Sequence, residues 1–268
     1  LVSILLMHRA APDEQRPWHT LLAGAATGLV FLTKPEIFAA VLAANVTVLL
    51  VWCHGLWRAS DRRAYARVLG LNAGLWAGGG LGVTALAVVA FVRVLPPGEA
   101  LAAVAGAWRY VWGHSNLASS YFQATMGTDD VTGNLLRLAR AVVLLGLFTG
   151  LAAAAQYLAR NCSRRTSAVL AVGAAGAAAV ATYCVVAGFG RIWHVLPVVV
   201  VGGGITAVWR LFRGPARGAP AASNSLLLAF SCFAGGLLLK ILLRARLAHY
   251  GFALALPATL VFVVVVLV

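Results

Sequence analysis

The stretch "GLVFLTKPEIFAAV", residues 28–41, decides how the chain folds, because Lys-Pro-Glu interrupts a long apolar run there. Lys34 and Glu36 flank Pro35, which fits poorly inside a helix and restricts the residue before it. The apolar residues on the two sides form segments of about 14 and about 18 residues, and both are predicted to be helical. The stretch therefore predicts a short helical hairpin whose turn carries Lys34 and Glu36.

Composition places the whole chain in a membrane. Of its 268 residues, 62% are hydrophobic and 10% are charged, against roughly 45–50% and about 25% in soluble domains. Apolar stretches of about 17 residues or more recur, and each would cross a hydrocarbon core of about 30 Å as a helix. We expect an all-α, polytopic transmembrane helix bundle that forms a single domain over residues 1–268.

Roughly seven complete spans and two cut spans are predicted, because the chain begins and ends inside apolar runs, as a fragment would. The expected helices cover residues 1–7, 19–33, 36–53, 69–92, 135–158, 168–188, 193–210, 225–243 and 252–268.

Charge sets the predicted orientation. The net charge is +14, and the basic residues gather in alternate short loops, as at 58–67 and 160–165, which the positive-inside rule assigns to the cytoplasm. This distribution indicates topology and argues against nucleic acid as a partner. The Lys-Pro-Glu turn and a long loop over residues 93–134 then lie on the extracytoplasmic side.

Cations on that outer side are candidates for binding an anionic head group. For Lys34 two interpretations stay open: an interfacial turn with a local Lys-Glu pair, or a lysine that faces a cavity and binds a lipid phosphate. Arginine offers paired hydrogen bonds to phosphate, although snorkelling to lipid head groups explains the same residues. The further candidates are Arg191, Arg244, Arg246 and His249.

The outer loop also brings aromatic and acidic candidates. Its aromatic residues would anchor an interfacial helix or contact a sugar or lipid chain, and the candidates are Trp108, Tyr110, Trp112 and, farther along, Tyr250. Three roles stay open for Asp129 and Asp130: a general base, a ligand of a divalent metal beside a phosphate, or a cap of the helix expected near Asn134. No zinc-type grouping occurs in the sequence, and no cofactor is predicted.

Glycines four residues apart predict close packing between helices, since small residues let backbones approach each other in lipid. The pairs are Gly24 with Gly28, Gly70 with Gly74, Gly74 with Gly78, and Gly146 with Gly150.

Two segments resemble a known family. "GAATGLVFLTKPEIFAA" (residues 24–40) and "LLRARLAHYGFALALPATL" (residues 242–260) are similar to segments of GT-C superfamily membrane glycosyltransferases related to protein O-mannosyltransferases and aminoarabinose transferases. The resemblance implies a bacterial inner-membrane enzyme that moves a sugar from a polyprenyl phosphate to a hydroxyl acceptor on the extracytoplasmic face. It implies that Lys34, or the cluster of Arg244 and Arg246, holds the donor phosphate.

The family's catalytic acid lies in a large extracytoplasmic loop near the N-terminus, and this chain begins after that point. The resemblance therefore leaves the catalytic residue of this chain unknown, with Asp129 and Asp130 as weak candidates. The alternative from another class is a secondary transporter or flippase for an anionic solute or lipid. The long aromatic loop favours the enzyme, because transporters keep their substrate contacts near the membrane midplane.

Overall fold

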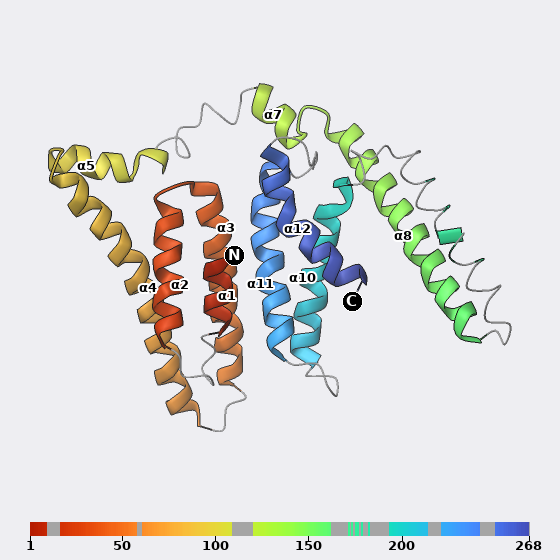
Figure 1. The fold of residues 1–268 in the computed structure, drawn as a ribbon, viewed down its shortest axis with the longest axis horizontal. Coiled ribbons are helices and arrows are strands. Elements are labelled where there is room, and N and C mark those ends of the chain that lie inside the picture. Colours follow the sequence, from red (N-terminus) through yellow and green to blue (C-terminus); the bar gives the residue numbers. More distant parts are fainter. Residues whose placement is uncertain are drawn as a thin grey trace. The chain divides into compact units, whose positions relative to one another are not determined.

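A computed structural model describes residues 1–9, 17–57, 61–108, 120–161, 193–213, 221–241 and 250–267, together with single positions between 171 and 182. Every regular element in these ranges is a helix (Figure 1), which confirms the all-α prediction. The elements are α1 (Val2–Arg9), α2 (Pro17–Phe31), α3 (Pro35–Leu56), α4 (Arg62–Val92), α5 (Pro97–Val104), α7 (Ser120–Met126), α8 (Val131–Asn161), α10 (Leu196–Arg213), α11 (Ala221–Leu238), the 3-10 helix η2 (Leu239–Ile241) and α12 (Tyr250–Leu267).

Four described segments are long and apolar enough to cross a membrane: Pro35–Leu56, Arg62–Val92, Gln123–Leu151 and Trp193–Arg213. This is typical of an α-helical membrane protein. The helix expected over 168–188 lies mostly outside the described residues, and the total of seven complete spans stays a prediction. At 15 residues, α2 is too short for a full crossing.

The helix expected over residues 69–92 begins earlier than the hydrophobic pattern indicates. It starts at Arg62, so positions predicted to lie in a cytoplasmic loop form the first turns of α4. The cause is Asp61, whose carboxylate accepts hydrogen bonds from the backbone N–H groups of Arg63 and Ala64, both at 3.0 Å. Such a cap satisfies donors that the first turn leaves unpaired.

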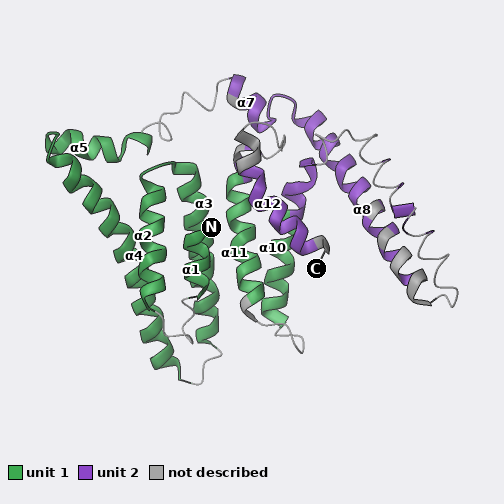
Figure 2. Ribbon diagram, viewed as in Figure 1, with its two compact units in different colours: residues 1–119, 200–237 green, residues 120–199, 238–268 purple. Residues whose placement is uncertain are grey.

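The chain divides into two compact units, which are coloured separately in Figure 2. Unit 1 comprises residues 1–119 and 200–237, and unit 2 comprises residues 120–199 and 238–268. Unit 1 contains α1 to α5, most of α10 and α11, whereas unit 2 contains α7, α8 and α12.

Within unit 1, α2 packs closely on α4 at two glycines. A Cβ at Gly24 would collide with the backbone carbonyl of Trp76, and one at Gly28 would lie 2.6 Å from the carbonyl oxygen of Gly80. This confirms the packing prediction for Gly24 and Gly28. For the other predicted glycines, a Cβ would meet no atom of the described residues within 4 Å; these are Gly70, Gly74, Gly78, Gly146 and Gly150.

Buried polar side chains join α1, α2 and α3 inside unit 1. Asn45, which is fully buried, donates from Nδ2 to Ser3 Oγ at 2.8 Å and to Thr27 Oγ1 at 3.0 Å. Ser3 and Thr27 in turn donate to the carbonyl oxygen of Ala23, at 2.9 and 2.8 Å. Hydrogen bonds of this kind help to hold helices together where lipid provides no hydrophobic driving force.

Unit 2 has a small apolar core in which Ala141 of α8 packs with Val195 and Val199. Val142 and Leu145 of α8 and Phe262 of α12 pack against this core. The unit thus connects α8 and α12 with the beginning of α10.

Candidate functional site

The Lys-Pro-Glu turn forms as predicted, as the link between two helices of unit 1. The last turn of α2 closes through backbone hydrogen bonds from Thr33 and Lys34 to the carbonyl oxygen of Val30, at 3.1 and 3.2 Å. Lys34 has extended backbone angles (φ −138°, ψ 116°), and Pro35 starts α3. A proline in this first helical position needs no hydrogen-bond partner for its nitrogen. The side chains of Lys34 and Glu36 are both exposed.

Three aromatic rings gather at the base of this turn. Phe31 at the end of α2 and Phe38 in the first turn of α3 have ring centroids 5.2 Å apart in an edge-to-face arrangement. Trp108, from the segment that follows α5, stacks on Phe31 at 5.2 Å and meets Phe38 edge-on at 5.5 Å. Such aromatic pairs stabilise a contact by about 0.5–1.5 kcal/mol beyond the area they bury. The segment that follows α5 is therefore attached to the hairpin through Trp108.

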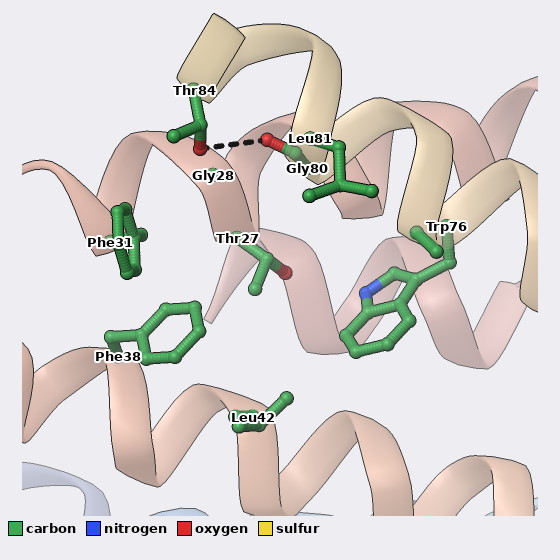
Figure 3. Close-up of a pocket in the computed structure, with 10 residues that line it drawn as sticks. Thr27, Gly28, Phe31, Phe38, Leu42, Trp76, Gly80, Leu81 and Thr84 are labelled. Atoms are coloured by element: carbon green, nitrogen blue, oxygen red, sulfur yellow. Dashed lines mark hydrogen bonds between the residues drawn. The ribbon is translucent and has the colours of Figure 1, made fainter. Parts of the chain in front are cut away.

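A cavity of about 350 Å³ lies between α2, α3 and α4, and Phe31 and Phe38 form part of its wall. Figure 3 shows Leu42 of α3 and Leu81 and Trp76 of α4 around the same space. The volume falls in the range of small-molecule pockets, about 300–1,000 Å³. Because Phe31 and Phe38 each lie within about one helical turn of Lys34, the cavity reaches the end of the hairpin that carries the lysine.

The cavity wall is almost wholly apolar. Its hydroxyl groups are already occupied: Thr84 donates to the carbonyl oxygen of Gly80 at 3.0 Å, as drawn in Figure 3, and Thr27 donates to that of Ala23. The indole nitrogen of Trp76 is buried and has no hydrogen-bond partner among the described residues. The arrangement suits a hydrocarbon ligand and leaves one donor available.

The acidic pair lies in unit 2, where Asp130 acts as a helix cap. Its Oδ1 accepts a hydrogen bond from the backbone N–H of Gly133 at 2.9 Å, and its Oδ2 is 3.7 Å from Arg137 Nη2. Arg137 also donates to the buried Asn134 at 2.7 Å, and Asn134 donates to the carbonyl oxygen of Gly127 at 2.8 Å. The capping interpretation is thus confirmed for Asp130, and Asp129 beside it is exposed.

The structure brings together one predicted phosphate-binding residue, Lys34, and one predicted sugar or lipid contact, Trp108. Tyr250 is the first residue of α12 in unit 2. The remaining candidates lie outside the described residues: Arg191, Arg244, Arg246, His249, Tyr110 and Trp112. Within the described part of the chain, no group of three or more His, Cys, Asp or Glu side chains could hold a metal ion.

Sequence reasoning missed the cavity wall, namely Phe31, Phe38, Leu42, Trp76 and Leu81. In a chain this apolar, large hydrophobic residues carry no signal of their own. Gly28 and Gly80 are the residues whose small size could have indicated the cavity, because both line the space they help to form. Pairing them requires the register of α2 on α4.

Comparison with models of known protein families, with characterised proteins and with solved structures finds no match to this chain. The fold defines an α-helical membrane protein, and a function has to be argued from the site itself.

Proposed function

We propose that this protein is a membrane glycosyltransferase that transfers a sugar from a polyprenyl phosphate to a hydroxyl acceptor on the extracytoplasmic face. One observation carries the proposal. Lys34 is exposed at the turn of the hairpin, and Phe31 and Phe38 on either side of that turn line an apolar cavity. A cation beside a space of hydrocarbon character matches a ligand that joins a phosphate to a long apolar chain. The resemblance of residues 24–40 to GT-C transferases agrees with this ligand.

The chemistry explains why a fixed cation would help. When the glycosyl–phosphate bond breaks, its electron pair stays on the leaving phosphate, and the acceptor hydroxyl bonds to the sugar and gives up its proton. Negative charge therefore grows on the phosphate in the transition state, so a nearby ammonium group stabilises that state more than the ground state. Asp130 is engaged as a helix cap, so the base that takes the proton is not assigned to it.

A flippase or transporter for an anionic lipid is the second candidate, because a cation beside an apolar cavity would also bind a lipid that is moved rather than cleaved. The polar cluster of Ser3, Thr27 and Asn45 next to the cavity favours it, since transporters use buried polar groups within the membrane. The two candidates differ in whether the bond between phosphate and sugar breaks.

The test is a transfer assay in membrane vesicles that contain the protein. Polyprenyl-phosphate mannose and polyprenyl-phosphate aminoarabinose are supplied as donors, and release of polyprenyl phosphate is measured. Lys34→Ala should lower the rate about ten- to hundredfold, because a hydrogen bond to a charged group contributes about 1.5–3 kcal/mol. Lys34→Arg should keep most of the activity.

Arg67→Ala is the matched control, because Arg67 is exposed near the start of α4, at the other end of that helix from the cavity residues Leu81 and Thr84. It should leave the rate unchanged. Equal rates for Lys34→Ala and Arg67→Ala would remove Lys34 from the donor site. Movement of an intact donor across the vesicle membrane, with no release of polyprenyl phosphate, would favour the flippase over the transferase.

A further inference from the structure

The cavity of unit 1 extends along the hydrophobic part of α4. Its wall includes Thr84 toward the outer end of that helix and Trp76 two turns deeper, which are about 12 Å apart along the helix axis. Both α3 and α4 are long and apolar enough to cross a membrane. The cavity therefore lies at a depth where hydrocarbon chains, rather than water, surround the protein.

Rigid contacts between backbones keep the cavity open. The backbones of α2 and α4 already touch at Gly24 with Trp76 and at Gly28 with Gly80, so these two helices cannot move closer together. The aromatic contacts among Phe31, Phe38 and Trp108 hold the outer end of α3. Because an empty apolar space forfeits the dispersion contacts of its lining, a ligand that fills it is favoured.

The chemistry of the wall selects the kind of ligand. Its threonine hydroxyls are already hydrogen-bonded within the protein, so the wall offers a chain nonpolar contact along its length. The exception is Trp76, whose nitrogen-bearing edge faces Thr27 across the cavity in Figure 3 and has no partner among the described residues. A buried N–H group is costly when left unpaired, and the π electrons of a carbon–carbon double bond can accept a weak hydrogen bond from it.

We propose that the cavity between α2, α3 and α4 binds the hydrocarbon chain of a phosphate-headed lipid, and that the indole N–H of Trp76 favours a chain with double bonds. Lys34 at the adjoining turn supplies the opposite charge for the phosphate. This inference deepens the proposed function and rests on the same site, because it names the wall that holds the lipid chain and the group that selects it. It adds Phe31, Phe38, Leu42 and Trp76 to the lipid site.

Binding of farnesyl phosphate to the purified full chain in detergent tests this proposal. The comparison ligands are its fully saturated analogue and dioleoyl phosphatidylglycerol, and the readout is the lipid-bound fraction in native mass spectrometry. Farnesyl phosphate should bind about two- to fivefold more tightly than the saturated analogue, which corresponds to one weak hydrogen bond of about 0.5–1 kcal/mol. Trp76→Phe keeps an aromatic ring but removes the N–H group, so it should abolish that preference.

A cavity-filling variant and its matched control locate the binding. Ala77 lines the cavity and is exposed, so Ala77→Phe can fill the space without burying a new group in the core. It should weaken binding at least about tenfold, as the loss of a few buried CH₂ contacts predicts. Ala85→Phe makes the same change on the same helix, at an exposed position that does not line the cavity, and it should bind like the native chain. Equal binding by Ala77→Phe and Ala85→Phe overturns the cavity as the site.

The remaining outcomes separate the sources of the chain. Tighter binding of farnesyl phosphate than of phosphatidylglycerol supports a polyprenyl lipid, whereas equal binding, if lost in Ala77→Phe, supports a phospholipid of the bilayer. Equal binding of farnesyl phosphate and its saturated analogue overturns the role of Trp76. Cavity-dependent binding by a protein that transfers no sugar supports this inference while contradicting the proposed function.

Discussion

Replacing Gly24 by alanine tests the close packing of α2 on α4, on which the cavity depends. The new methyl group would overlap the carbonyl group of Trp76. Because the obstacle is helix backbone rather than a flexible side chain, the two helices would have to separate. Overpacking of this kind typically costs about 1–3 kcal/mol.

The control for this variant is Gly74→Ala on α4. It makes the same chemical change, but the added Cβ would meet no atom of the neighbouring described residues within 4 Å. Both variants gain about 1 kcal/mol of helix propensity when glycine becomes alanine, so this gain cancels in the comparison. Gly24→Ala should therefore have a free energy of unfolding about 1–3 kcal/mol lower than that of Gly74→Ala.

Unfolding in mixed micelles with increasing sodium dodecyl sulfate, followed by tryptophan fluorescence, measures this difference. We expect the transition of Gly24→Ala to occur at a lower detergent fraction than in the native chain, and that of Gly74→Ala to occur at the same or a higher fraction. Equal transitions for the two variants would refute the close contact between α2 and α4, and with it the reasoning about the cavity walls.

Two further predictions concern polar groups. Asn45→Ala removes the hydrogen bonds to Ser3 and Thr27. It should lower the free energy of unfolding by about 1 kcal/mol, since such bonds between membrane helices average about 0.6 kcal/mol each. Thr47→Ala on the same helix should lower it less, and the reverse order in the same micelle assay would argue against the cluster. Asp130→Ala should lower stability by about 0.5–2 kcal/mol through loss of the α8 cap, whereas Asp130→Asn, which keeps a capping oxygen, should lower it less. If Asp130→Ala instead abolished sugar transfer at unchanged stability, the carboxylate would be catalytic rather than structural.

Local chemistry explains which features the sequence could predict. Pro35 cannot continue a helix in the ordinary way, so the turn between α2 and α3 follows from three adjacent residues. The Gly24 and Gly28 pair likewise shows its small-residue face in the sequence alone. A cap from Asp129 or Asp130 was one expected role because both come shortly before an apolar helical run, and the structure assigns it to Asp130.

The remaining features depend on contacts between distant parts of the chain. Gly28 meets Gly80, and Phe31 meets Trp108, and no local pattern in the sequence sets these pairings. Open glycines such as Gly74 have the same spacing as Gly24 and Gly28, which shows that spacing alone does not say which glycines make contact. The sequence does not mark Trp76 as a ligand contact, because that role depends on the apolar cavity beside its buried nitrogen.

The most direct test of the central claim, that Lys34 and the cavity form one site for a phosphate-headed hydrocarbon chain, is photolabelling by polyprenyl phosphate. A diazirine is placed on the isoprene unit next to the phosphate, the full chain is labelled in membranes, and the labelled peptides are mapped. We expect labels on residues 31–42 and 76–84, with labelling reduced in Lys34→Ala and in Ala77→Phe. Labels spread over the exposed face of α4 around Gly74 and Ala85, and unchanged in both variants, would contradict it.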